Sequence, residues 1–244
     1  GGASTPVTRR SEAREERVLA SVAFVGAPMV GKSAILDRVT GEKFSHGYQA
    51  TVGADFRLLD VKVNDQNFSL RLWDTAGDSR LAALGDAFYR SADAYVLVYD
   101  VSNRATFTAL DEYWELCEQA NPNPDFPAIV VGNKTDLAER EVSDEEVRRW
   151  CQERRDGSAA AAIPHVVCSA RDNTGVAQAF TQLATVLHEL IAGEEATPNG
   201  PEQQRFFTGD DDTGSCFSCG LFSAFATMFK NGSLDLPGSP ARRV

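Results

Sequence analysis

The chain has 244 residues, of which 43% are hydrophobic, and its formal net charge is −11. This length and composition suit one globular domain with tails, and the acidic balance argues against binding to nucleic acid or general electrostatic attraction to an anionic membrane. Five cysteines, an odd number at scattered positions, favour free thiols over a disulfide framework.

The first predicted element is a buried strand at 18–25, followed by a glycine-flanked loop and a helix that starts near Ala34. Such a loop aims several backbone N–H groups at one point in front of the helix, which makes an anion site. Lys32 then reaches the β- and γ-phosphates of a nucleoside triphosphate, and the Ser33 hydroxyl binds the bridging Mg²⁺. The expected nucleotide contacts in this segment are Gly26, Ala27, Pro28, Met29, Val30, Gly31, Lys32, Ser33 and Ala34.

A hairpin is predicted next, with strands at 55–63 and 67–73 and a turn at 64–66. It supplies the one antiparallel pair of an otherwise parallel sheet. The remaining strands are predicted at 94–100, 128–132 and 164–167. Strands that alternate with helical patterns indicate an α/β fold, with helices on both faces of a six-stranded sheet and ligands at the carboxyl ends of its strands.

The second strand of the hairpin ends in Asp74, and Gly77 follows shortly after it. An acidic residue at this place suits the binding of Mg²⁺ through water beside the phosphates. Gly77 leaves room for the γ-phosphate because it has no side chain. The metal site is therefore predicted to include Asp74 together with Ser33.

Two later strands end in residues that suit a guanine base. Asn133, Lys134 and Asp136 follow the strand at 128–132, and a carboxylate that accepts from both the N1–H and the exocyclic amine of guanine rejects adenine. After the strand at 164–167, a backbone N–H can donate to the guanine O6. The residues predicted to form this side of the base site are Ser169, Ala170 and, at its rim, Arg171.

With these motifs in this order, the chain resembles the Ras superfamily of small GTPases, and within it the Rab (Ypt) family, over roughly residues 17–193. The segment 53–56 (Gly-Ala-Asp-Phe) looks most like the late-endosomal branch. The resemblance implies a P-loop G domain that binds GTP or GDP with Mg²⁺. It also implies that Thr51 is the switch threonine that contacts the γ-phosphate and Mg²⁺, and that Tyr48 is the aromatic residue that covers the nucleotide.

The resemblance implies partners as well: an exchange factor, a GTPase-activating protein, and effectors that bind the GTP form. Phe56, Trp73 and Phe88 match the aromatic triad that Rab effectors contact. The alternative for these three residues is packing in the core, because aromatic residues at strand ends are usually buried.

The chain departs from the Rab pattern at Asp78, where most Rabs have glutamine. The glutamine orients the attacking water, whereas a carboxylate has no N–H and adds negative charge beside the γ-phosphate. We therefore expect slow intrinsic hydrolysis, with Asp78, Gly77, Thr51 and Lys32 as the catalytic residues. Hydrolysis assisted by an activating protein would still be possible if that protein supplies its own Arg and Gln.

Pro28 and Met29 are a second departure, since Rab-like loops commonly carry small residues there. Proline removes one N–H from the loop, and Met29 lacks the conformational freedom of glycine. We expect altered nucleotide affinity or an altered approach for an arginine supplied by a partner. Binding itself should survive, because the other contact residues are present.

Composition changes along the chain predict four parts: an N-terminal extension (1–16), the G domain (17–193), an acidic flexible linker (194–220) and a tail with a short amphipathic segment (221–244). Residues 238–244 lack a prenylation signal. The start Gly1 to Thr5 matches either an N-myristoylation pattern or the remnant of a cleaved tag. We expect a cytoplasmic protein, with peripheral attachment to endomembranes if Gly1 carries a lipid.

These motifs are compatible with two functions. In the first, the protein is a GTP-dependent switch of vesicle traffic whose segments around Thr51 and Gly77 respond to the γ-phosphate. In the second, it is a structural or adaptor subunit that holds a nucleotide with little cycling. An ATPase or nucleoside kinase is disfavoured, because Asp136 selects guanine.

Overall fold

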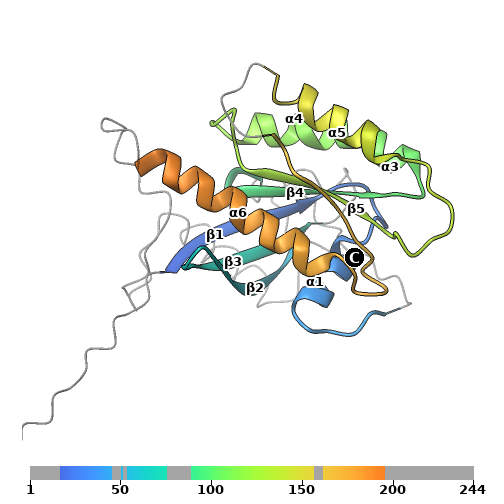
Figure 1. The fold of residues 1–244 in the computed structure, drawn as a ribbon, viewed down its shortest axis with the longest axis horizontal. Coiled ribbons are helices and arrows are strands. Elements are labelled where there is room, and N and C mark those ends of the chain that lie inside the picture. Colours follow the sequence, from blue (N-terminus) through green and yellow to red (C-terminus); the bar gives the residue numbers. More distant parts are fainter. Residues whose placement is uncertain (1–16, 46–50, 52–53, 76–88, 157–161, 196–244) are drawn as a thin grey trace, which may run out of the picture. The chain divides into compact units, whose positions relative to one another are not determined.

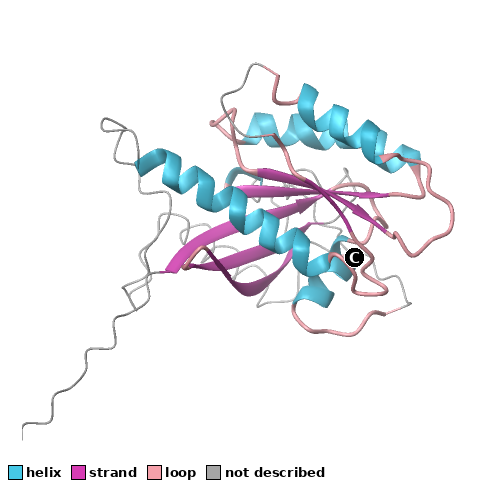
Figure 2. Cartoon of the chain, viewed as in Figure 1, coloured by secondary structure: helices cyan, strands magenta, loops and turns pink. Residues whose placement is uncertain are grey.

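The computed structural model describes residues 17–45, 51, 54–75, 89–156 and 162–195. In chain order the elements are β1 (Arg17–Val25), α1 (Lys32–Val39), β2 (Ala54–Val63), β3 (Gln66–Thr75), β4 (Ala94–Asp100), α3 (Arg104–Thr108), α4 (Leu110–Ala120), β5 (Ala128–Asn133), α5 (Asp144–Glu153), β6 (His165–Val167) and α6 (Val176–Glu195). Strands and helices alternate along most of the chain (Figures 1 and 2). This alternation is the pattern that the sequence predicts.

The strands form one sheet in the order β2-β3-β1-β4-β5-β6. β2 and β3 are antiparallel, and the other neighbouring strands pair in parallel. The prediction of a six-stranded sheet with one antiparallel pair is confirmed. The hairpin turn consists of Asn64 and Asp65, both with positive φ (47° and 65°), as two-residue turns between twisted strands require. Gln66, which we assigned to the turn, is the first residue of β3.

The central strands are covered on both faces. All seven residues of β4 and all six of β5 are buried, as expected for parallel strands between two layers of helices. One core cluster joins the sheet to α1 and α6 through residues such as Phe24 and Leu187. The other joins it to α3, α4 and α5 through Tyr95, Trp114 and Phe126, and Figure 1 shows the two helical layers on opposite sides. Helices on both faces are thus confirmed.

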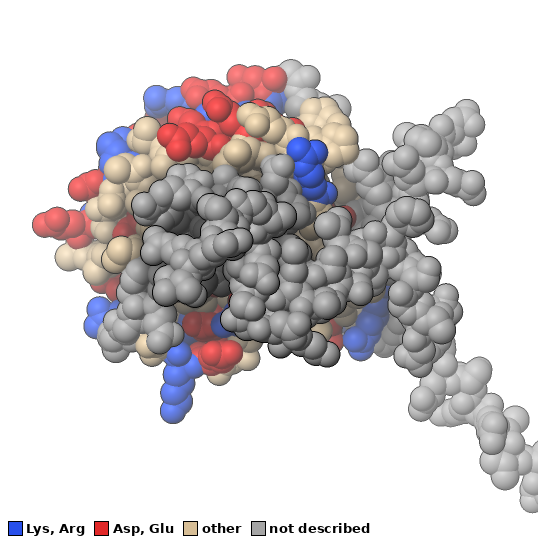
Figure 3. Space-filling view, turned by 180° about the vertical axis from the view of Figure 1, so that it is seen from behind, with Lys and Arg blue, Asp and Glu red and all other residues tan. Residues whose placement is uncertain are grey.

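The surface and the thiols agree with the composition. On the face in Figure 3, the described basic and acidic side chains are interspersed. Cys117, Cys151 and Cys168 are buried free thiols, while Cys216 and Cys219 lie outside the described residues. Among the helices of the described ranges, none has the length and apolar character needed to cross a bilayer.

Candidate functional site

The loop between β1 and α1 depends on two glycines. Gly26 has φ +138°, and a Cβ there would lie 2.2 Å from the carbonyl oxygen of Val98. Gly31 is the N-cap of α1 with φ +99°, and its Cβ would lie 2.2 Å from Nδ2 of Asn133. Any larger residue at either position meets both a strained backbone and an occupied space. The loop therefore passes close to β4 and β5 before α1 begins.

Lys32 folds back across this loop. Its Nζ donates to the carbonyl oxygens of Gly26 (2.8 Å) and Ala27 (3.0 Å), and only 6% of the residue is exposed. Burial lowers the pKa of Lys32 to about 8, and the nearby charge of Asp74 opposes this shift. The ammonium group is thus held at the loop that is predicted to bind phosphates.

Met29, one of the two unusual residues of the loop, adopts a backbone conformation that suits glycine better. Met29 has φ +65°, a left-handed conformation that costs a side-chain-bearing residue on the order of 1 kcal/mol. Its side chain is exposed (63%). Val30, next to it, is fully buried, so the loop presents an apolar side chain to solvent beside the expected phosphate site.

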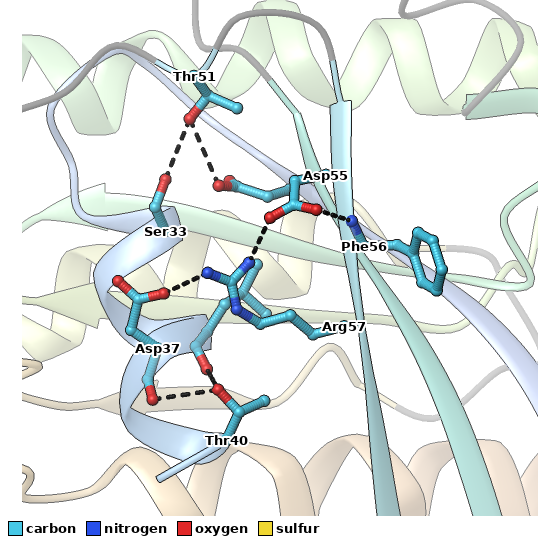
Figure 4. A network of polar contacts seen from close by, with 9 residues as sticks. Ser33, Asp37, Thr40, Thr51, Asp55, Phe56 and Arg57 are labelled. Atoms are coloured by element: carbon cyan, nitrogen blue, oxygen red, sulfur yellow. Dashed lines mark hydrogen bonds and ion pairs between the residues drawn. The ribbon is translucent and has the colours of Figure 1, made fainter. Parts of the chain in front are cut away.

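Three oxygen-bearing side chains meet in front of α1. The hydroxyls of Ser33 and Thr51 lie 3.2 Å apart (Figure 4), and Thr51 Oγ1 donates to Oδ2 of Asp74 over 3.4 Å. Asp74 is 3% exposed, and its buried Oδ1 has no hydrogen-bond partner among the residues that the structure describes. Burial raises the pKa of Asp74, and hydrogen bonds and charges from Ser33, Lys32 and others oppose it.

An unpartnered buried carboxylate oxygen needs a physical explanation. Mg²⁺ takes oxygen ligands and commonly uses one or two carboxylates together with phosphates and water. The hydroxyl of Thr51, 3.2 Å from that of Ser33 and 3.4 Å from the carboxylate of Asp74, completes a set of oxygen atoms that fits that ion. The residues predicted for the metal, Ser33, Thr51 and Asp74, are therefore brought together by α1, the segment before β2, and β3.

Asn133 at the end of β5 connects the two halves of the candidate site. Its Nδ2 donates to the carbonyl oxygen of Val30 (2.8 Å), and its Oδ1 accepts the amide of Ala170 (3.0 Å). The side chain is 2% exposed. The loop predicted to bind phosphates and the loop predicted to bind the base therefore share one buried amide.

Asp136 lies on the base side with its carboxylate held in place. Ser169 Oγ donates to its Oδ1 (2.7 Å), and the Arg171 guanidinium approaches its Oδ2 (3.6 Å). The amide of Ala170, one of the backbone N–H groups in the segment expected to donate to guanine O6, already donates to Oδ1 of Asn133. A bound base would compete with Oδ1 of Asn133 for that amide.

The ion pair between Lys134 and Asp100 is a feature of the site that the sequence motifs did not reveal. Lys134 Nζ lies 2.7 Å from Asp100 Oδ2. Burial raises the pKa of Asp100, but hydrogen bonds from Lys134 and Ser102 outweigh it and hold that pKa below its usual range. Asp100 is the last residue of β4. Because ligands of such folds bind at the carboxyl ends of the strands, its position could have identified it.

Two members of the aromatic triad lie opposite each other on β2 and β3. The rings of Phe56 and Trp73 are 5.4 Å apart. Phe56 is 43% exposed and Trp73 only 7%, so one ring faces solvent and the other is mainly packed. Four expected functional residues, Tyr48, Gly77, Asp78 and Phe88, lie outside the described residues.

The chain is similar to known proteins over most of its length. A family model described as the Ras family matches residues 21–189. "Ras-related protein Rab7" of Drosophila melanogaster is 38% identical over 207 residues, which cover 84% of this chain and 97% of that protein. "Ypt/Rab-type GTPase Rab7" of Gibberella zeae is 39% identical over 202 residues (81% and 90%). "Ras-related protein Rab7" of Pisum sativum is 37% identical over 205 residues (82% and 92%).

Proposed function

Because the chain belongs to the Rab (Ypt) family of small GTPases of vesicle traffic, and to its late-endosomal, Rab7-like branch, we propose that it is a magnesium-dependent GTP switch with slow intrinsic hydrolysis. The observation that carries this proposal is the convergence of three groups at one edge of the sheet. These groups are the ammonium of Lys32, the oxygen cluster of Ser33, Thr51 and Asp74, and the held carboxylate of Asp136.

Each group has a separate part in nucleotide binding. Lys32 balances the charge of the β- and γ-phosphates, which the loop amides also bind. Ser33, Thr51 and Asp74 would hold Mg²⁺, which would supply positive charge against the negative charge that develops during transfer. Asp136 accepts hydrogen bonds that guanine offers and adenine does not, and Ser169 keeps the carboxylate oriented.

The switch property depends on Thr51. Its hydroxyl is within hydrogen-bond distance of both Ser33 and Asp74, although Thr51 comes from a different segment of the chain. A γ-phosphate with its metal would order that segment, and loss of the γ-phosphate would release it. Effectors that contact the exposed ring of Phe56 on β2 would then sense which nucleotide is bound.

Nucleotide uptake tests the proposal directly. The full chain, stripped of nucleotide and offered GTP and ATP with Mg²⁺, should bind GTP at least about a hundredfold more tightly, since a carboxylate left unpaired by adenine costs a few kcal/mol. Asp136→Asn serves as the matched variant and should lose this preference. Equal binding of GTP and ATP by the unaltered chain would reject the function.

Asp78 is proposed to slow the intrinsic reaction, because its carboxylate offers no N–H to the developing charge and repels the γ-phosphate. Asp78→Gln should raise the single-turnover hydrolysis rate about tenfold or more, the effect of roughly 1.4 kcal/mol in the barrier. Asp78→Asn is the control, because it removes the charge without the reach of glutamine. An Asp78→Gln rate equal to that of the unaltered chain would remove Asp78 from the catalytic residues.

A second function is supported by the same substitution. A nucleotide-holding adaptor has no need for fast hydrolysis, and Asp78 in place of glutamine suits such a protein. The two functions differ in what their partners sense. A switch binds its partners more tightly in the GTP form than in the GDP form, whereas an adaptor binds them equally in both. Pull-down from the cells of origin with each loaded form, compared by mass spectrometry, distinguishes them.

A further inference from the structure

The guanidinium of Arg57 joins the helix of the metal site to the strand that follows Thr51. One terminal nitrogen donates to Oδ1 of Asp37 (2.5 Å) and the other to Oδ2 of Asp55 (2.9 Å). Asp37 belongs to α1, while Asp55 and Arg57 belong to β2. Figure 4 shows the fork of Arg57 between the two carboxylates, close to Ser33 and Thr51.

The positions of these residues tie the bridge to the metal site. Asp37 is four residues after Ser33 on α1, so both side chains lie on one face of the helix. Asp55 and Arg57 are two residues apart on β2 and therefore share a face of the strand. Thr51 comes three residues before β2 begins. The bridge thus fixes the start of β2 against the helix that carries Ser33.

The contact between Arg57 and Asp37 is better protected from water than the pair of Arg17 and Asp60, whereas Asp55 is 65% exposed. The side chains of Arg57 and Asp37 are 19% and 25% exposed, whereas those of Arg17 and Asp60 are 57% and 67% exposed. A planar guanidinium that holds two carboxylates at once also has a more defined geometry than a single exposed contact. Arg57 is therefore suited to hold backbone segments in place, while the pair of Arg17 and Asp60 contributes little.

We propose that Arg57 is a positioning residue for the switch threonine: through Asp37 and Asp55 it holds the start of β2 against α1 so that Thr51 meets Ser33 at the metal site. This inference rests on the proposed function, since it concerns the same nucleotide and metal site. Arg57 itself contacts neither nucleotide nor metal in this role.

Asp55 also connects the bridge to Phe56, the exposed residue proposed to contact effectors. Oδ1 of Asp55 accepts the backbone N–H of Phe56 (2.9 Å), while its Oδ2 is bound by Arg57. One carboxylate therefore supports both the link to α1 and the backbone at the exposed aromatic residue. A change of position in the Thr51 segment would be transmitted to Phe56 through this short path.

The test measures release of a fluorescent GTP analogue from the full chain with saturating Mg²⁺ and again with excess EDTA. Arg57→Leu should speed release in Mg²⁺ about three- to tenfold, as expected for loss of a partly buried guanidinium that pairs with two carboxylates. In EDTA the variant and the unaltered chain should release the analogue at equal rates, because Thr51 then has no metal to bind. Asp37→Asn should act in the same direction, and the double variant should add little to either single change.

Arg17→Leu is the matched control, since it removes an arginine from an exposed pair in the same sheet, and it should leave both rates unchanged. Arg57→Lys keeps one charge without the fork and should be intermediate; with Asp37→Asn it carries the test if Arg57→Leu does not fold. Equal acceleration by Arg57→Leu in Mg²⁺ and in EDTA, or no acceleration at all, would overturn the positioning role. Failure of the unaltered chain to bind the analogue would instead overturn the proposed function and this inference with it.

Discussion

Burial of Lys32 brings the pKa of its side chain close to ordinary pH. Its pKa falls to about 8 because the ammonium group is largely removed from water, and only Asp74 opposes the shift. The ammonium group donates hydrogen bonds to two carbonyl oxygens of the loop. The charged form is the one that attracts phosphates, so nucleotide binding and protonation of Lys32 are linked.

Nucleotide affinity should therefore fall as pH rises through about 8. The free protein loses the Lys32 proton there, while the bound protein retains it because the phosphates favour the ammonium form. Between pH 7 and 8.5 the dissociation constant of a fluorescent GDP should rise about fourfold at constant Mg²⁺ and ionic strength. Lys32→Arg, which stays charged throughout, should show no such rise. A flat profile for the unaltered chain would contradict the linkage.

At the scale of the elements, the side chain of Arg155, which follows α5, helps to hold the loop between α4 and β5. Arg155 donates to the carbonyl oxygens of Pro124 (3.2 Å) and Phe126 (2.5 Å), and its guanidinium lies over the rings of Trp114 and Phe126. The side chain is 7% exposed and pairs with Asp125 at 3.6 Å. Three elements that meet at this corner therefore depend on one arginine.

Replacement of this arginine should destabilise the fold. Arg155→Met removes the donor that Arg155 supplies to the carbonyls of Pro124 and Phe126 and should lower the free energy of unfolding by about 2–4 kcal/mol. Arg149→Met is the control on α5, because the contact of Arg149 with Glu145 (3.8 Å) is exposed and worth less than about 0.5 kcal/mol. Urea unfolding measures both. Similar losses for the two variants would show that the corner does not depend on Arg155.

At the scale of the whole molecule, we expect a falling pH to reduce the stability of the fold first through a buried histidine. His165 on β6 stacks against Tyr99 and lies 3.1 Å from its hydroxyl, and burial lowers its pKa to about 4. Between pH 6.5 and 4 the unfolded chain binds a proton at this residue that the folded chain does not. The contribution of His165 to stability is therefore complete above pH 6.5 and is lost as the pH falls towards 4.

The free energy of unfolding should drop by about 2 kcal/mol between pH 7 and 5 from His165 alone. Unfolding by urea at several pH values measures this drop. In His165→Gln, which cannot take up the proton, the same interval should show only the smaller change due to the carboxylates. Parallel pH profiles for the two proteins would mean that His165 is protonated in the folded state.

The sequence predicted the sheet, its antiparallel pair and most of the site because these depend on local signals: apolar runs, glycines that no other residue can replace, and polar residues at strand ends. Gly26 and Gly31 were recognised in this way. The bridge of Arg57 to Asp37 was missed, since nothing in the spacing of 20 residues indicates that a strand and a helix meet there. The partner of Asn133 on the loop, a carbonyl oxygen, has no sequence signal at all.

The buried amide of Asn133 has a practical meaning for protein engineering. Its Nδ2 binds the loop before α1, and its Oδ1 binds the segment after β6. We therefore expect a substitution of Asn133 to disturb recognition of the purine and of the phosphates at the same time. Among the described residues, the side-chain partners of Asp136 are Ser169 and Arg171, and both belong to the loop proposed to bind the base. A version of this protein that accepts a different base is therefore best sought by altering residue 136 and leaving residue 133 intact.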